Sequence, residues 1–124
     1  MEVTFDQRVD YIYVKVDGEY SLDRARDSVR ELLETMLKEG FKKAIVDSLD
    51  MQGAPTHLEM YKYANFVSNL ITSSREFLDM TLVYVEIRVR SGVDQFGDVI
   101  ALNWGVKIHL AESMDQALEI LKST

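Results

Sequence analysis

Apolar residues change their spacing along this chain of 124 residues, and that change constrains the fold more than any other feature. Ile12, Val14 and Val16 alternate with other side chains, which is the period of a strand with one buried face. From Ser21 to Gly40 the apolar residues recur every three or four positions, so they share one face of a helix. Strand and helix periods continue to alternate, which predicts an α/β chain with helices packed on a mostly parallel sheet.

The predicted order of elements is ββαβαβαβα. An opening hairpin is predicted around residues 3–5 and 11–16, and further strands are predicted over residues 44–46, 80–87 and 106–110. Helices are predicted over residues 21–40, 56–71, 93–104 and 113–121. Ser21 and Gly40 suit the two ends of the first helix, and residues 56–59 and 113–116 each have the spacing of a capping box.

Composition excludes several classes of function. Residues 1–124 have the length of one domain, and their 47% hydrophobic content is that of a folded protein. There is no cysteine, which excludes disulfides, thiolate metal sites and cysteine nucleophiles. With 14 basic and 21 acidic residues, the net charge of −7 argues against binding to nucleic acid.

The sequence predicts neither a targeting segment nor a membrane-spanning segment. The first residues have no basic segment followed by an apolar one, and no stretch approaches the roughly 18 apolar residues of a membrane span. We therefore expect no integral membrane segment and a cytoplasmic location.

Polar residues follow the predicted strands, where an α/β sheet of the doubly wound kind usually binds its ligands. Asp47 and Asp50 follow the strand over residues 44–46, and Thr56 and His57 precede the next helix. The two aspartates have the chemistry to hold a divalent cation or to act as acid and base, but an aspartate at a strand exit also commonly accepts bonds from loop amides.

Two arginines end another predicted strand. Arg88 and Arg90 are two residues apart and would point the same way if the strand extends that far, so they could hold an anion between them. The alternative is that both are solvated surface residues.

No motif indicates an enzyme, a metal site or a cofactor. His57 and His109 are far apart in sequence, and the chain contains no phosphate-binding glycine loop, dinucleotide-binding turn or nucleophile elbow. We therefore expect a non-enzymatic protein without a cofactor.

One exposed strip is predicted on the second helix. Tyr61, with Leu58, Asn65 and Thr72, falls on the side away from the apolar stripe of that helix. Exposed aromatic residues are enriched in protein interfaces, although tyrosine is also often half-exposed without a binding role.

Several short segments carry a family resemblance. Residues 14–19 look like a strand that runs into a Gly-Glu turn, and residues 44–47, followed by Asp50 and Met51, look like the exit of a central strand. Residues 103–110 and 115–121 look like a last strand and a closing helix. Together with the order of elements they resemble the STAS domain, the family of sulfate transporters and anti-sigma factor antagonists, in its SpoIIAA-like, SEC14-related branch.

The resemblance implies a mixed, mostly parallel sheet with four flanking helices and a regulatory protein partner near the second helix. In anti-sigma factor antagonists the segment that enters this helix reads Asp-Ser-Ser-Gly or close to it, and a serine there is phosphorylated to break the partner complex. Residues 54–59 of this chain lack that acid, both serines and the glycine. Thr56 is the nearest hydroxyl, either as a phosphorylated switch or only as a helix cap.

Two hypotheses of function stay open at this stage. The first is a regulatory module that binds a protein through its second helix, with Asp47, Asp50, Thr56, His57 and Tyr61 as candidate residues and a homodimer as one form. The second, implied by the SEC14-related branch, is a domain that binds a lipid or another small apolar anion, with Arg88 and Arg90 at the head group.

Overall fold

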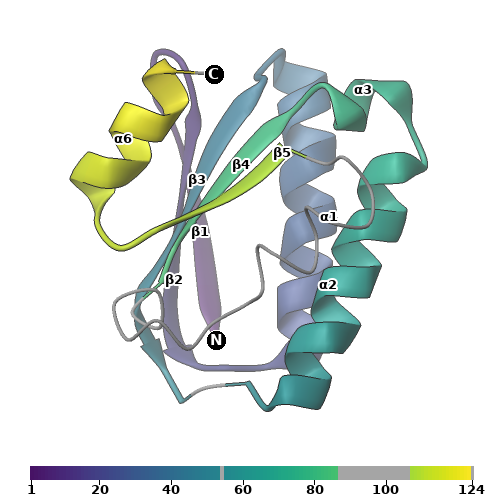
Figure 1. The fold of residues 1–124 in the computed structure, drawn as a ribbon, viewed down its shortest axis with the longest axis vertical. Coiled ribbons are helices and arrows are strands. Elements are labelled where there is room, and N and C mark those ends of the chain that lie inside the picture. The colour runs from purple at the N-terminus through teal and green to yellow at the C-terminus, as the bar shows by residue number, and fades with distance from the viewer. Residues whose placement is uncertain (54, 87–106, 124) are drawn as a thin grey trace.

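The computed structural model describes residues 1–53, 55–86 and 107–123 (Figure 1). Its strands are β1 (Glu2–Gln7), β2 (Ile12–Glu19), β3 (Lys43–Gln52), β4 (Thr81–Val85) and β5 (Lys107–Ala111). Its helices are α1 (Leu22–Glu39), α2 (His57–Thr72), α3 (Arg75–Leu78) and α6 (Met114–Lys122). The predicted helix over residues 93–104, Arg88 and Arg90 all lie outside the described residues.

The five strands form one mixed sheet in the order β1-β2-β3-β4-β5. β1 pairs antiparallel with β2, which confirms the opening hairpin, and the other three pairings are parallel. In the parallel part Ala44 lies beside Ile12 on one side and Leu82 on the other. The predicted fold class, a mixed and mostly parallel α/β sheet, is confirmed.

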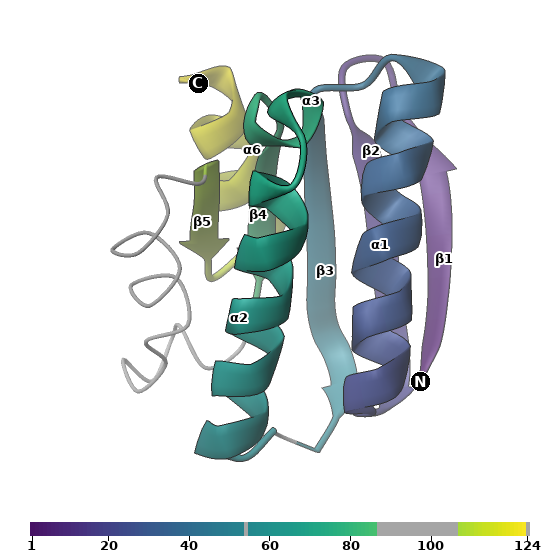
Figure 2. The same ribbon diagram turned by 90° about the vertical axis from the view of Figure 1, so that its right-hand side faces the viewer.

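Helices cover both faces of the sheet. In Figure 2, α1 and α2 lie side by side in front of the sheet and α6 lies behind it. Alternate residues of β3 and β4 serve the two sides: Ala44 and Leu82 belong to the core under α1 and α2, whereas Ile45 and Val83 pack with Ala117 of α6. The sheet is therefore buried on both faces at its centre, which explains the unbroken apolar runs of these strands. Among the described helices, none is both long and apolar enough to cross a bilayer.

α1 begins and ends as its sequence predicts. The Ser21 side chain accepts a hydrogen bond from the backbone N–H of Arg24, and Gly40 takes a left-handed conformation with φ of 80°. The amide of Gly40 donates to the carbonyl of Met36, which closes the last turn. Leu33 and Met36 on the inner face are fully buried, so the stripe read from the sequence is the packed face.

The structure departs from the prediction most at β3 and α3. β3 continues to Gln52 rather than ending near residue 47, so Asp47 and Asp50 lie within a strand and not in a loop after it. Pairing of residues 50–52 with the end of β2, beyond a register shift between Lys15 and Asp17, extends the ladder past the apolar run. The short helix α3 was not predicted, because its four residues are too few to show a helical period.

The second predicted capping box is only half formed. Ser113 accepts from the backbone N–H of Gln116 at 3.1 Å, as predicted. The Gln116 side chain, however, accepts from the N–H of Glu112 at 2.7 Å, one residue before the cap. The Gln116 side chain reaches past the cap, and its bond to the N–H of Glu112 still satisfies a backbone donor at the start of α6.

The described sheet does not reverse its strand order. Ligand sites at the edge of doubly wound sheets form where neighbouring crossovers leave the sheet in opposite directions. Here the order simply follows the sequence, and α1 and α2 lie on the same face. The described strands therefore contain no such reversal point, and a ligand site at their carboxyl ends stays a prediction.

Candidate functional site

The start of α2 is fixed by a complete capping box. The Thr56 hydroxyl accepts a hydrogen bond from the backbone N–H of Glu59 at 3.1 Å, and the Glu59 carboxylate accepts from the N–H of Thr56 at 2.9 Å. This confirms the predicted box. These two hydrogen bonds hold the first turn in one conformation. His57, the first residue of the helix, is exposed.

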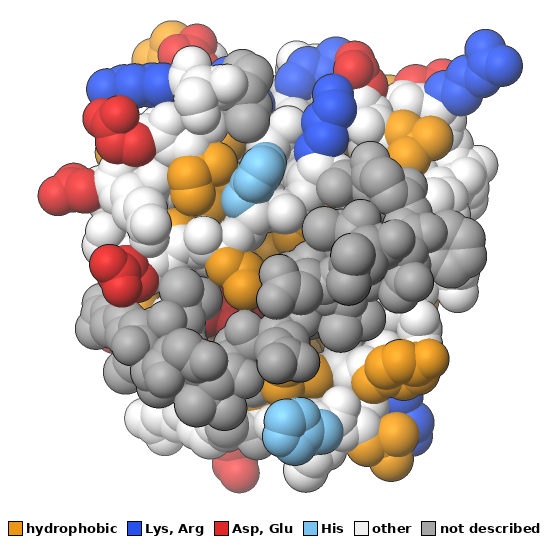
Figure 3. Space-filling view, viewed as in Figure 1, with side chains coloured by type: hydrophobic (Ala, Val, Ile, Leu, Met, Phe, Trp, Pro, Cys, Tyr) orange, Lys and Arg blue, Asp and Glu red, His pale blue; other side chains and the backbone are white. Residues whose placement is uncertain are grey.

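The outer face of the same turns is apolar. Leu58 is 61% exposed and Tyr61 is 59% exposed, whereas Ala64 and Val67 on the inner face are buried. Figure 3 shows hydrophobic side chains on the surface over the start of α2, toward the lower right. We call Thr56, His57, Leu58 and Tyr61 the α2 surface. Of the other two residues predicted for this strip, Thr72 is exposed and Asn65 is only half-exposed.

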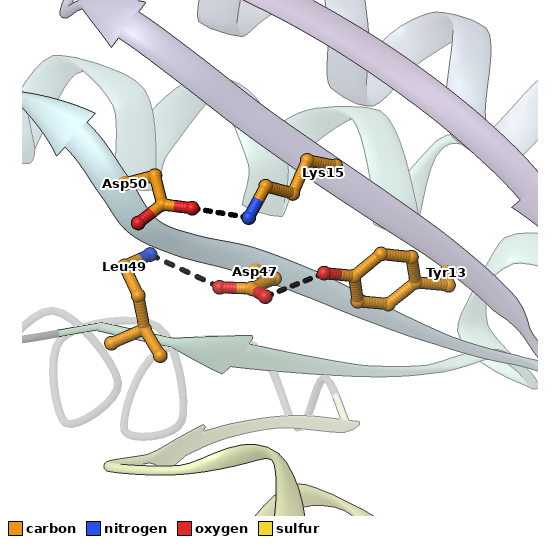
Figure 4. Close-up of polar contacts among 5 residues, drawn as sticks. All are labelled: Tyr13, Lys15, Asp47, Leu49 and Asp50. Carbon is orange, nitrogen blue, oxygen red and sulfur yellow. Dashed lines mark hydrogen bonds and ion pairs between the residues drawn. The ribbon is translucent and has the colours of Figure 1, made fainter.

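Asp47 is buried and accepts two hydrogen bonds (Figure 4). The Tyr13 hydroxyl donates to its Oδ2 at 2.6 Å, and the backbone N–H of Leu49 donates to its Oδ1 at 3.1 Å. The guanidinium of Arg8 lies 5.0 Å from the centre of the Tyr13 ring. The structure thus shows Asp47 bonding a nearby amide, one of the two roles that its sequence position left open.

Asp50 has a different neighbour. Its carboxylate pairs with the ammonium group of Lys15 across the β2–β3 pair, as Figure 4 shows, and its side chain is 59% exposed. Asp47 and Asp50 therefore bind separate groups. Within the described ranges there is no cluster of three or more histidine, aspartate or glutamate side chains suited to a metal ion.

The predicted site residues do not come together in one place. Leu49, which donates to Asp47, packs in the core under α6, whereas Ser48 and Met51 face α1 and α2. Figure 4 shows the Asp47 and Asp50 contacts on the side of the sheet away from the two long helices. The α2 surface is on the other side. His109 is half-buried on β5, and the two arginines lie outside the described residues.

Burial and the bond to Asp47 raise the pKa of Tyr13 to about 12, from an ordinary value of 10.0. Because the folded protein holds this proton more tightly than the unfolded chain, the resulting stabilisation is complete below pH 10 and is lost as the pH rises through about 12. We expect Tyr13→Phe to remove phenolate absorbance centred near pH 12 from the titration curve of the protein.

Asp47→Asn is the matched change for this titration, because it keeps the phenol and removes the negative charge beside it. We expect it to move the Tyr13 transition down toward pH 10. If Tyr13→Phe instead removed absorbance centred at pH 10, the bond to Asp47 would not hold the proton as inferred.

The sequence did not single out one polar cluster under α1 and α2. The hydroxyls of Tyr63 and Tyr84 lie 2.7 Å apart, with their rings 6.3 Å apart in an edge-to-face arrangement. Together with Glu86 they line a cavity of about 70 Å³ between the two helices and the sheet. Both tyrosines lie on predicted core positions, and a buried tyrosine needs a hydrogen-bond partner for its hydroxyl. The sequence therefore indicated that each tyrosine hydroxyl needs a partner, but it did not identify that partner.

Solved structures of other proteins share this fold. An anti-sigma factor antagonist from Mycobacterium paratuberculosis superimposes with a TM-score of 0.58 at 11% identity, over 98% of this chain and 93% of that one. The anti-sigma factor antagonist SpoIIAA in its unphosphorylated form gives 0.55 at 10% identity, over 99% and 100% of the two chains.

A third structure, an uncharacterised protein from Shewanella loihica described as having a SpoIIAA-like fold, gives a TM-score of 0.51 at 17% identity, over 97% and 92%. No protein-family model matches the chain, and no curated protein matches it in sequence. The likeness shows the SpoIIAA-like fold, which is the fold that the sequence resemblance implied.

Proposed function

We propose that this protein is a non-enzymatic regulatory module that binds a protein partner through the α2 surface. The observation that supports this most is the pair Leu58 and Tyr61, which are 61% and 59% exposed on a helix whose opposite face is buried. Large apolar side chains that are adjacent on one exposed helix face are typical of interfaces, where tyrosine often contributes most to binding.

The solved structures support the same class of function. Two of the three proteins compared above are named anti-sigma factor antagonists, and they match nearly the whole chain. One fold can carry several functions, so the similarity in fold alone does not support a partner-binding role. It supports that role here together with the exposed α2 surface. We infer a partner that presents an apolar patch to α2.

Thr56 and His57 form the rim of this surface. The capping box fixes the first turn, so the positions of Leu58 and Tyr61 depend on it. A phosphate on Thr56 would add bulk and acceptor oxygens where the Glu59 amide now donates to the hydroxyl, and it would place negative charge beside the Glu59 carboxylate, although the helix N-terminus itself favours an anion. A charged group at Thr56 would therefore alter the surface that the partner meets.

We leave Asp47 and Asp50 out of the binding surface. Asp47 is buried in the sheet and bonded to Tyr13 and Leu49, and Asp50 pairs with Lys15 on the sheet face away from α2. Their contacts support a role in holding β2 and β3 together.

The test is affinity purification with quantitative mass spectrometry, followed by binding measurements with the purified partner. We expect a protein recovered with the unchanged chain to bind Tyr61→Ala about tenfold more weakly, because the ring supplies much of the exposed apolar area. Thr56→Glu is expected to weaken binding as well. Circular dichroism would establish that both variants fold.

Val9→Ala is the matched control, because Val9 is 95% exposed but lies in the β1–β2 connection and not on α2. It is expected to bind normally. Sedimentation of the purified chain would show whether a second copy is the partner, in which case Tyr61→Ala should dissociate the dimer. A partner that binds both α2 variants as tightly as the unchanged chain would contradict the proposal.

A further inference from the structure

β1 is an edge strand, and its outer side has no partner among the described strands. The sheet order begins with β1, which pairs with β2 alone of these strands. In Figure 2, β1 is the outermost strand, and α1 lies between it and α2. An edge strand presents N–H and C=O groups that can pair with another strand. The outer side of β1 is therefore a place where the sheet can be extended.

The β1–β2 hairpin shows which backbone groups of β1 point outward. The N–H of Arg8 donates to the carbonyl of Tyr11 at 2.8 Å, so these two residues face each other as a hydrogen-bonded pair. Such pairs alternate along an antiparallel ladder, and the register carries this alternation along β1 without a shift. The even-numbered residues of β1 therefore bond to β2, whereas the N–H and C=O groups of Val3, Phe5 and Gln7 point away from it.

β1 lacks the features that commonly prevent edge pairing. Natural edge strands are often protected by proline, lysine, a bulge or a charge that points into the core. Residues 2–7 contain no proline or lysine, and their pairing with β2 shows no bulge. The core side of β1 carries Val3 and Phe5, which are half-buried, whereas Glu2 and Asp6 are exposed. The strand is thus suited to pairing, and its charges restrict what it pairs with.

A second copy of β1 fits this edge. Two copies related by a two-fold axis run antiparallel, and the register follows from the residue that faces itself across the axis. With Phe5 on the axis, Val3 of each copy faces Gln7 of the other. The backbone groups of all three point outward, so they form three pairs that each exchange two hydrogen bonds. The two Phe5 rings then meet on the core side of the sheet, where each is already half-buried.

Charge favours this register over its neighbours. With Phe5 on the axis, Glu2 of each copy faces Arg8 of the other on the exposed side of the sheet. Thr4 on the axis would instead set Glu2 against Asp6, and Asp6 on the axis would set two carboxylates against each other. Arg8 already donates through Nε to Asp6 at 2.6 Å, and its guanidinium has further N–H groups for Glu2 of the second copy.

We propose that this protein forms a symmetric homodimer in which the two β1 strands pair antiparallel about Phe5 and join the two sheets into one. Registers centred on Val3 or Gln7 also avoid like charges, but they leave only one hydrogen-bonded pair within β1. The dimer does not use the α2 surface, because α1 lies between α2 and the β1 edge in Figure 2. The two surfaces can therefore be tested separately.

The first test uses the unchanged chain. Sedimentation equilibrium is expected to show a mass that rises from 14.3 kDa toward twice that value as the protein concentration increases. It is measured at physiological ionic strength, because the net charge of −7 on each copy opposes association and salt screens charges more than about 8 Å apart. A mass that stays at 14.3 kDa up to about 1 mM protein would overturn the proposal.

Amide exchange measured by NMR locates the interface. The amides of Val3, Phe5 and Gln7 are expected to exchange more slowly as the concentration rises, because they gain partners in the dimer. The amides of the even-numbered residues of β1 already bond to β2 and are expected to change little. A dimer that protects none of the three outward amides would place the interface elsewhere and contradict the proposal.

Gln7→Pro removes an outward N–H without removing a bond to β2, and its ring obstructs a second strand. We expect it to weaken dimerisation by about tenfold or more. Gln7→Ala is the matched control, because it keeps the N–H, and it is expected to dimerise normally. Tyr61→Ala is also expected to leave the dimer intact. A dimer that Tyr61→Ala dissociates and Gln7→Pro does not would assign the interface to α2 and exclude β1.

Two charge reversals test the register. Glu2→Arg alone sets two positive charges against each other and Arg8→Glu alone sets two negative charges against each other, so each variant is expected to dimerise about tenfold more weakly. When the two variants are mixed, both facing pairs again have opposite charges, and the mixed dimer is expected to recover most of the lost affinity. A mixture that associates no better than either variant alone would show that the register about Phe5 is wrong.

Discussion

Leu33→Ala is expected to lower the free energy of unfolding by about 3 kcal/mol. Leu33 is fully buried on the inner face of α1, where it packs against the sheet in the core that α1 and α2 share. Truncation removes the transfer free energy of the side chain and leaves a cavity that the neighbouring strands cannot fill, because they are fixed by their ladder.

Leu37→Ala is the matched control for Leu33→Ala, since Leu37 follows one turn later in the same helix and is 47% exposed. The same chemical change there is expected to cost less than about 1 kcal/mol. Urea unfolding of both variants measures the difference, provided that the free energy of unfolding depends on urea concentration with the same slope in both. Equal losses would mean that α1 does not bury the face that its apolar stripe indicates.

Asp47→Ala is expected to lower the free energy of unfolding by about 2 kcal/mol, the second largest of the effects predicted here. The carboxylate is buried and accepts from both the Tyr13 hydroxyl and the Leu49 amide, so its loss leaves two donors without their acceptor. An unsatisfied donor in a folded protein loses its water without gaining a bond in return.

Two further variants locate the source of this loss. Asp50→Ala removes a carboxylate from the same strand, but that carboxylate is exposed, and we expect a much smaller change. The double variant Tyr13→Phe with Asp47→Ala is expected to lose less than the sum of the two single changes, because they remove the same bond. Additive losses would contradict a direct interaction, and a loss from Asp50→Ala as large as from Asp47→Ala would contradict the role of burial.

Most of the fold was predictable because its signals are local. The helix over residues 21–40 followed from its cap, its apolar stripe and its closing glycine, and all three are present in the structure. The capping box at Thr56 was equally local, since its two bonds join residues three positions apart. Such features depend on neighbours in sequence, and the sequence contains them completely.

The candidate site was less predictable because it depends on which way a strand faces. Asp47 and Ser48 are adjacent in sequence, yet one contributes to the α6 side of the sheet and the other lines the cavity under α2. The register shift between β2 and β3 then places Asp50 beside Lys15. Residues that the sequence grouped by proximity therefore separate onto opposite faces.

The sequence by itself determined the order of the five strands with α1, α2 and α6, the mostly parallel class of the sheet and the conformation at the start of α1 and α2, because hydrophobic period and capping act over a few residues. Only the tertiary structure decided that Tyr63 meets Tyr84 near Glu86 and that Asp47 bonds Tyr13 across 34 positions. These features arise where distant segments pack, and the period of one segment carries no information about the side chains of another.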